Sequence, residues 1–494
     1  MSEEKKTQQP QQPNPKGKLK FIIGAVIGAF LFLAPIPAGD GTFNIPLGIG
    51  INWLNDLFNF GEENTQDIRL WLAYIFIIFS FFMTLVAYII KPKFIMENEK
   101  LKEVLLTSPL YAITRLLAFI FMTLVIFDVQ LSFYIPTFEF NRADFSFTQV
   151  TVDLGAAIVD RWDGAGLMVF DLITGLTTIF LLLAFCIPIL TEFGLMEFIG
   201  VLIKNFVNKL FTLPGRASVD LAASWFGSSA VSVIITRDQH EKGFYTGREA
   251  ATICANFAFV SLPFSLVIAT TVDIQSHFLL WYLMICIICI ILGIITPRIW
   301  PLKQLPDTYL EGVEKQIDEE VEEGESRFQK AVFLASDRAE RTTVNDVISG
   351  GLNGWLTAFM DLFPVIIAWG TIALVVNNVT PILDIISLPM GWLLELFNVP
   401  GGADYAPITV IGFIDMFLPA IFLGTETYFN TRFILGALSI VQIIYMAETG
   451  VLILKSKMPL GLGKLFIVFI MRTVMALPLI VLFTWIFSTL GWIG

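Results

Sequence analysis

The chain has 494 residues, of which 55% are hydrophobic and only 15% are charged, whereas about a quarter of the residues are charged in soluble domains. This composition excludes an ordinary soluble protein and predicts an all-α integral membrane protein. Several apolar runs reach the roughly 20 residues that a helix needs to cross a bilayer, and none shows the alternation of barrel strands. The net charge of -12 comes from acidic residues concentrated in loops, and we expect no nucleic-acid partner.

The four cysteines all fall inside apolar runs, where cysteine behaves as a small buried hydrophobe. A disulfide framework is therefore not expected. Cys286 and Cys289 have a Cys-x-x-Cys spacing, but only His240 and His277 exist to complete a metal site. We expect no metal and no cofactor.

Residues 1–18 are polar and predict a disordered cytoplasmic tail. Residues 19–165 predict an N-terminal membrane region of about three spans, at Leu19–Ala34, Leu70–Ile90 and Pro109–Phe127. A lysine excess precedes the first span and places the amino terminus in the cytoplasm. Prolines follow it instead of a small-x-small cleavage site, so we interpret it as a retained helix. The acidic segment Asp128–Asp163 is then an external loop.

A six-residue word occurs twice. Leu210–Gly215 reads Leu-Phe-Thr-Leu-Pro-Gly and Leu396–Gly401 reads Leu-Phe-Asn-Val-Pro-Gly, 186 positions later. Upstream, Asp171 and Asp361 also lie in matching words. The pattern predicts two related repeats, at 166–297 and 347–494. Their spans are expected at Leu167–Leu190, Ala250–Thr270, Phe278–Ile295, Trp355–Val376, Phe433–Leu454 and Leu465–Phe487.

The run Ala217–Ile235 is long enough to cross the membrane, yet basic residues lie on both sides of it. One crossing would carry the later cations to the wrong side, so we expect Ser218–Ile235 to enter and return as a re-entrant hairpin. Asp404–Leu423 would be the second such element. The segment Asn377–Thr431 contains no Lys or Arg until Arg432, unlike its counterpart, and this predicts repeats inserted upside down relative to each other.

Residues 298–346 form an acidic linker, which the charge alternation places in the cytoplasm. Its glutamates cluster between Glu319 and Glu325, and the pattern is typical of a solvated helix.

Inverted-repeat transporters bind substrate and coupling ion near the midplane, where interrupted helices leave free helix ends. The polar residues that we expect there share a position in or beside the hairpins and the spans that follow them. They are Ser228, Ser229 and Asn256 in the first repeat, and Asp415, Thr425, Glu426, Gln442 and Glu448 in the second.

Three of these assignments, Glu426 and the two serines, carry alternatives. Glu426 in a membrane costs on the order of 2.5 to 3.5 kcal/mol, which suggests a compensating cation or proton, unless it lies at the external surface. Asp415 lies eleven residues before Glu426 and shares its face if one helix connects them. On the next span we expect a polar stripe formed by Gln442, Tyr445 and Glu448. Each serine has an alternative role as a small helix-packing residue.

The motifs Leu-Phe-Thr-Leu-Pro-Gly-Arg, Trp225-Phe226-Gly227-Ser228-Ser229-Ala230, Tyr245-Thr246-Gly247-Arg248-Glu249-Ala250 and Gly424-Thr425-Glu426-Thr427 resemble the YjiH-like bacterial inner-membrane family. That family carries the Gate, or nucleoside-recognition, domain. More distantly, the Gate domain is similar to parts of concentrative nucleoside transporters, of a ferrous iron transporter and of spore maturation proteins. Gly424-Thr425-Glu426 matches a short nucleoside-transporter motif, but no Asn-Pro-Glu-Ser sequence accompanies it.

These observations predict about ten spans plus two hairpins, in a secondary transporter of a small polar solute coupled to Na⁺ or H⁺. The expected location is the bacterial plasma membrane. The alternative is a membrane scaffold that resembles spore maturation proteins. Partners would be the lipid bilayer, a small-molecule solute and a second copy or another membrane protein. An enzyme is not expected, because there is no P-loop and no recognisable nucleophile motif.

Overall fold

The computed structural model describes residues 14–37, 43–58, 67–97, 105–106, 109–129, 131–142, 144–160, 165–313, 315–316, 326–424 and 428–493. These residues are mostly helical, and eight helices are long and apolar enough to cross a membrane. The candidate spans are Ile68–Ile89, Pro109–Ile126, Met168–Thr191, Gly247–Thr271, Gln275–Arg298, Val344–Val379, Phe429–Lys455 and Leu462–Thr489. The structure thus confirms the predicted helical membrane bundle.

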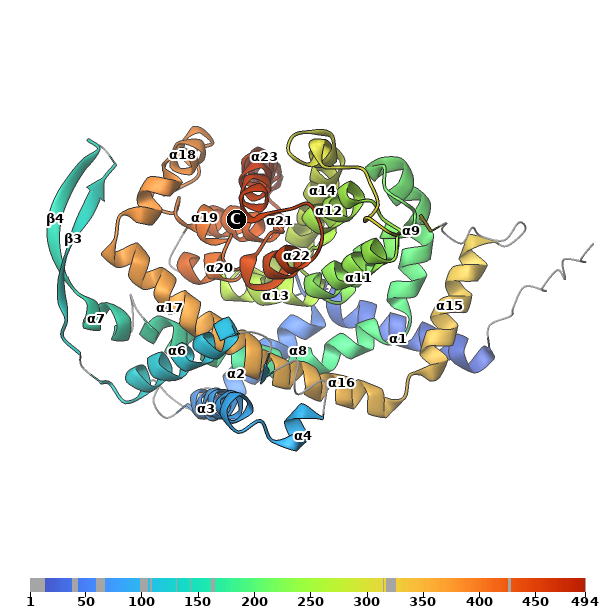
Figure 1. Ribbon diagram of the computed structural model, residues 1–494, viewed down its shortest axis with the longest axis horizontal. Helices are drawn as coiled ribbons and strands as arrows, with labels where there is room; N and C mark the ends of the chain where they lie inside the picture. Colours follow the sequence, from blue (N-terminus) through green and yellow to red (C-terminus); the bar gives the residue numbers. More distant parts are fainter. Residues whose placement is uncertain are drawn as a thin grey trace, which may run out of the picture.

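The N-terminal region contributes α3 (Ile68–Ile89) and α6 (Pro109–Ile126), which pack together along one edge of the molecule (Figure 1). The first helix, α1 (Pro15–Leu33), is not among the eight candidates. It carries three lysines at its start, and the Lys20 ammonium donates to the carbonyls of Glu340 and Thr342 at the end of α15 (Arg327–Arg341). Its crossing of the membrane stays a prediction.

Three of the candidate spans contain wide π-helical turns, and in two of them the turn holds an aspartate. Leu167–Ile173 forms η2, which continues into α8 (Thr174–Thr191). In the second span, α16 (Val344–Thr357) continues through η6 (Ala358–Leu362) into α17 (Phe363–Val379). Asp171 and Asp361 belong to these two turns, and π turns of this kind are frequent at functional sites.

The repeated word ends a helix in both places. α9 (Leu195–Phe211) stops before Thr212, and α18 (Ile382–Leu396) stops just before Asn398. Both residues adopt left-handed backbone angles, with φ of 56° at Thr212 and 52° at Asn398. The Pro-Gly that follows cannot continue a helix. The same sequence word therefore ends a helix at a left-handed residue twice.

Short helices follow the ends of α9 and α18. α10 (Ala217–Phe226) and α11 (Ser229–Glu241) pack against each other after the first, and α19 (Ile408–Ile411) and α20 (Leu418–Leu423) follow the second. At a rise of about 1.5 Å per residue, none of the four is long enough to cross about 30 Å of hydrocarbon.

The next span in each half is interrupted. α12 (Gly247–Phe257) and α13 (Leu262–Thr271) are separated by four non-helical residues, and α21 (Phe429–Val441) is separated in the same way from η7 (Met446–Gly450) and α22 (Val451–Lys455). α14 (Phe278–Ile295) and α23 (Leu462–Thr489) complete the two halves, which lie side by side in Figure 1.

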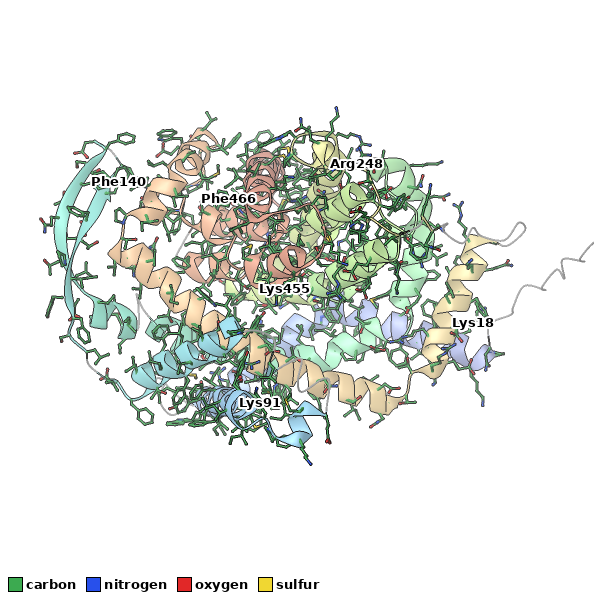
Figure 2. The ribbon with its side chains drawn as sticks, in the orientation of Figure 1. Lys18, Lys91, Phe140, Arg248, Lys455 and Phe466 are labelled. Atoms are coloured by element: carbon green, nitrogen blue, oxygen red, sulfur yellow. The ribbon has the colours of Figure 1, made fainter. Side chains whose placement is uncertain are left out.

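The segment predicted as an external loop contains an antiparallel hairpin. β3 (Tyr134–Asn141) pairs with β4 (Ser146–Asp153), and Tyr134 lies opposite Asp153. The Thr137 hydroxyl donates to the carbonyl of Val379 and fixes the hairpin to the end of α17. Figure 2 shows Phe140 of this hairpin at the opposite end of the molecule from Lys18.

The remaining short elements are β1 (Ile36–Pro37), β2 (Phe43–Asn44), α2 (Pro46–Phe58), α4 (Lys93–Met96), α7 (Leu154–Val159), η3 (Gln275–His277), η4 (Thr296–Arg298) and η5 (Leu302–Gln304). The start of the linker docks on α12, where the amides of Gly247 and Arg248 donate to the carbonyls of Thr308 and Pro306. The glutamate cluster Glu319–Glu325 lies outside the described residues, so its solvated-helix assignment stays a prediction.

Candidate functional site

The break between α10 and α11 begins the candidate site. Ser228 has extended backbone angles and caps α11, because its side-chain oxygen accepts a hydrogen bond from the amide of Ala230 at 3.2 Å. A serine at this position satisfies one of the amides that a helix start leaves without a partner. Ser229 follows as the first residue of α11 and is buried.

Glu448 from the second half binds this helix start. Its Oε1 accepts hydrogen bonds from the Ser228 hydroxyl at 3.1 Å and from the Ala230 amide at 3.3 Å. The amino end of a helix carries a partial positive charge that stabilises a carboxylate. Its Oε2 is buried and has no hydrogen-bond partner within the described residues. The contact joins two residues 220 positions apart.

Asp415 lies next to Glu448 on the second half. The amides of Met446 and Ala447 donate to the carbonyls of Phe413 and Ile414 at 2.8 and 2.9 Å. This pairing runs the two segments alongside each other and brings Asp415 and Glu448 close enough for a Coulombic interaction. Asp415 is 5% exposed, and its Oδ1 accepts from the Phe417 amide at 2.8 Å. A buried carboxylate thus lies beside a half-buried one.

The interrupted span of the first half contacts the same region. The Ser224 hydroxyl of α10 donates to the carbonyl of Phe259 at 2.7 Å, and the rings of Trp225 and Phe259 stack with centroids 5.6 Å apart. Phe264 of α13 contacts the ring of Phe417 in an edge arrangement. Both short-helix pairs and both interrupted spans therefore meet here, which gives free helix ends and two acids in one place.

Asn256 and Gln442 lie in networks of their own. Asn256 accepts hydrogen bonds from Arg472 at 2.8 Å and from the Thr296 hydroxyl. Arg472 also donates twice to the carbonyl of Val441, at 3.0 and 2.8 Å. The Gln442 amide donates to the Thr409 carbonyl and the Thr473 hydroxyl. These bonds hold the interrupted spans and α23 together, and none of them reaches Ser228 or Glu448.

One expectation about a helix face is wrong, and the condition attached to a second is not met. The polar stripe through Gln442, Tyr445 and Glu448 does not form, because α21 ends at Val441 and Glu448 belongs to the separate turn η7. Asp415 does not share a continuous helix with residues towards Glu426, because α20 begins only at Leu418. Thr425 and Glu426 themselves lie outside the described residues, and their site role stays a prediction.

The sequence interpretation missed two buried arginines. Arg115 is 1% exposed and forms an ion pair with Asp361, and Arg472 is fully buried. Both interrupt runs that we treated as plain spans. A charged residue inside an apolar run is a functional signal in its own right, and it would have pointed to both.

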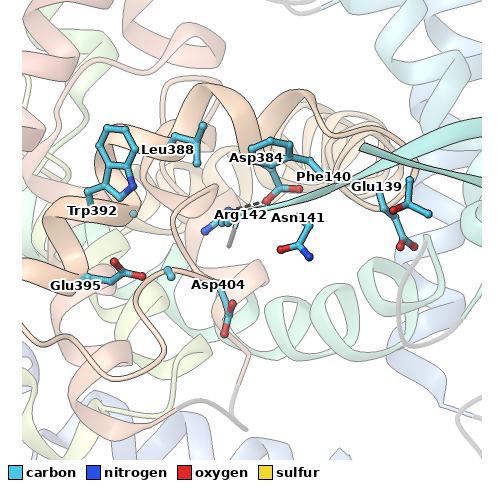
Figure 3. Close-up of a pocket in the computed structure, with 12 residues that line it drawn as sticks. Glu139, Phe140, Asn141, Arg142, Asp384, Leu388, Trp392, Glu395 and Asp404 are labelled. Atoms are coloured by element: carbon cyan, nitrogen blue, oxygen red, sulfur yellow. Dashed lines mark hydrogen bonds and ion pairs between the residues drawn. The ribbon is translucent and has the colours of Figure 1, made fainter. Parts of the chain in front are cut away.

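A large cavity lies away from this site. It has a volume of about 880 Å³ and lies between the β3–β4 hairpin and α18, where Arg142 pairs with Asp384 at 2.6 Å (Figure 3). None of the sequence-predicted site residues lines it. Within the described ranges, no group of three or more His, Cys, Asp or Glu side chains could hold a metal ion.

The fold and this site define a transporter-like, multi-pass membrane protein, and the comparisons with known proteins agree. The family model for the Gate domain, described as nucleoside recognition, matches residues 173–275. That range includes the α10–α11 pair and the interrupted span α12–α13. The match points to a transporter and not to an enzyme.

The chain belongs to the same family as the uncharacterized protein BpOF4_10220 of Alkalihalophilus pseudofirmus (strain ATCC BAA-2126 / JCM 17055 / OF4). The two are 38% identical over 472 residues, which cover 95% of each chain. No solved structure matches.

Proposed function

We propose that the protein is a secondary transporter of a small polar solute in the bacterial plasma membrane, with its amino terminus in the cytoplasm. The observation that carries the proposal is the Glu448 carboxylate on the amino end of α11. It brings a helix end of one half and an acid of the other together beside the buried Asp415. Secondary transporters place their solute and coupling ion at such junctions of interrupted helices.

The proposal includes two inverted repeats, each with a re-entrant hairpin. Three pairs of features support the duplication: the left-handed Thr212 and Asn398, the π turns η2 and η6, and the interrupted spans α12–α13 and α21–η7. The loops that follow α9 and α18 differ in charge, since the first is basic and the second has no Lys or Arg before Arg432. Halves of opposite orientation produce this difference.

The solute is proposed to be nucleoside-like and its coupling ion to be Na⁺ or H⁺. The description of the Gate model as nucleoside recognition supports the first part. The second part follows from Asp415 and Glu448, because two neighbouring carboxylates, one of them buried, need a cation or a proton to offset their charge.

A thermal-stability screen tests the proposal. Purified protein in detergent would be heated with nucleosides, nucleobases, short peptides and carboxylates, each in sodium and in potassium. A solute at 100 times its dissociation constant stabilises a protein by roughly 2.7 kcal/mol. Glu448→Gln should remove the stabilisation, whereas Glu395→Gln, an exposed glutamate, should keep it.

If no compound of the panel stabilises the folded protein, the result would contradict the transporter proposal and favour a scaffold. A solute that still stabilises Glu448→Gln would place the binding site elsewhere.

A further inference from the structure

Helix α6 lies outside the part of the chain that matches the Gate model, yet it reaches the candidate site. The Tyr111 hydroxyl donates a hydrogen bond to the carbonyl of Ala447 at 3.3 Å, directly before Glu448. Tyr111 also lies close enough to Glu448, Asp415, Asp361 and Arg115 for Coulombic interactions with all four. One tyrosine thus lies between two groups of charged residues.

The second of these groups is the ion pair of Arg115 and Asp361. Arg115 follows Tyr111 by one helical turn, so both side chains lie on the same face of α6. Its guanidinium pairs with Asp361 and donates to the Thr84 hydroxyl at 2.6 Å and to the Met360 carbonyl at 3.2 Å. Three helical elements, α3, α6 and η6, are therefore fastened at one buried cation.

The π turn η6 makes this arrangement possible. A π turn inserts an extra residue into a helix and leaves a backbone carbonyl available for other donors. In η6 the Met360 carbonyl accepts from the Ser80 hydroxyl at 2.9 Å as well as from Arg115. The next residue is Asp361, which the turn presents to α6.

Carboxylates predominate among the described charged groups that act on Tyr111. They are Asp361, Asp415 and Glu448, and the cation Arg115 acts on the same hydroxyl. Tyr445 also faces Glu448, but its hydroxyl donates to the carbonyls of Ser439 and Ile440. Carboxylate charge is costly at bilayer depth, and protonation of a carboxylate removes that cost.

We propose that α6 is part of the ion-coupling machinery. Tyr111 is a positioning residue that joins the Asp415–Glu448 pair to the Arg115–Asp361 pair, and protons bound by this cluster are the coupling ions. The inference rests on the proposed function, because a coupling ion has meaning only in a transporter. It assigns the N-terminal region a role that the Gate domain alone does not contain.

Infrared difference spectroscopy of the protein reconstituted in lipid measures carboxyl protonation without any solute. The C=O stretch of protonated carboxyls would be titrated across the neutral pH range, in sodium and in potassium. We expect a titrating band in wild-type protein that Asp361→Asn alters. Tyr111→Phe keeps the ring but loses the bond to Ala447, and should shift the midpoint by about one pH unit, a tenfold change in proton affinity.

Tyr74→Phe is the matched control. Tyr74 also lies in a span, and its hydroxyl hydrogen-bonds to that of Thr123 of α6 at 3.0 Å. Thr123 is not one of the site residues named above. This variant should leave the midpoint unchanged. A melting temperature close to that of the wild type would show that each variant is folded.

Three results would overturn the inference: no titrating carboxyl in the wild type, a band that sodium removes, or equal midpoints for Tyr111→Phe and Tyr74→Phe. The solute screen can fail independently of these results. A titrating, Tyr111-dependent cluster without any stabilising solute would contradict the transporter proposal and leave the proton-binding cluster in place.

Discussion

The contact between Ser228 and Glu448 predicts a measurable coupling between the two halves of the protein. Ser228→Ala removes the cap of α11 and one donor to Glu448, which should destabilise the protein by about 1 kcal/mol. Glu448→Ala removes the acceptor from both Ser228 and Ala230. A hydrogen bond to a charged group contributes about 1.5 to 3 kcal/mol, so this variant should lose about 2 to 4 kcal/mol.

The double variant isolates the interaction energy of the Ser228–Glu448 contact from the effect that each substitution has by itself. Once Glu448 is alanine, the serine hydroxyl has lost its charged acceptor, and its removal should cost less than it does in the wild type. We expect a coupling energy of about 1 to 2 kcal/mol, near a tenfold change in the unfolding equilibrium constant.

Unfolding in mixed micelles, followed by tryptophan fluorescence, would give the four free energies of the cycle. Ser336→Ala provides the matched control, because Ser336 is a buried serine on α15 whose hydroxyl donates to the Val332 carbonyl. Its effect should add to that of Glu448→Ala without coupling. If the Ser228 cycle is equally additive, the end of α11 does not bind Glu448, and the site described above is refuted.

Three further predictions concern other parts of the molecule. Arg472→Met should destabilise the protein by about 2 to 4 kcal/mol, because the Val441 carbonyl loses both donors in a dry interior, whereas Arg338→Met, in an exposed ion pair with Glu192, should cost less than about 1 kcal/mol in the same assay. Lys209→Cys and Glu395→Cys occupy matching positions 186 residues apart, and a membrane-impermeant thiol reagent should label them from opposite sides; labelling from one side would contradict the inverted repeats. Hydrogen bonds from the side chain and the amide of Ser146 lower the pKa of Asp144 below its ordinary value of 3.8, so this carboxylate stabilises the hairpin turn above its unfolded pKa and loses that effect as the pH falls through the lowered value. Ser146→Ala should raise the pKa, as measured from the carboxyl chemical shift, and an unchanged pKa would contradict the assignment.

The apolar runs allowed the spans to be predicted because burial in lipid requires an uninterrupted apolar helix, and the run Leu70–Ile90 matches α3 to within a few residues. The sequence interpretation missed the hairpin of β3 and β4. Its strands alternate apolar residues, such as Tyr134 and Phe138, with polar ones, but the acidic segment that contains them is too short to bury one face of a sheet. The hairpin is also attached to the Val379 carbonyl through Thr137, and that residue is far away in the sequence.

The residues of the candidate site could be predicted from the sequence, but the contacts between them could not. Ser228 and Glu448 were identified as polar residues at bilayer depth, but a single sequence contains no signal that they touch across 220 positions. The break at Val441 was also hidden, since Gln442 to Tyr445 contains neither glycine nor proline. It depends on Arg472, which supplies the hydrogen bonds that the end of α21 lacks.

The Arg472 network makes the two halves of the chain depend on each other. Its guanidinium comes from the second half, as does the Val441 carbonyl, but its third hydrogen bond goes to Asn256 of the first half. One half supplies the buried cation, and the other supplies an amide that solvates it. Expressed alone, the second half would lose that hydrogen bond and leave the charge of Arg472 under-solvated in lipid. We therefore expect the second half to fold stably only in the presence of the first.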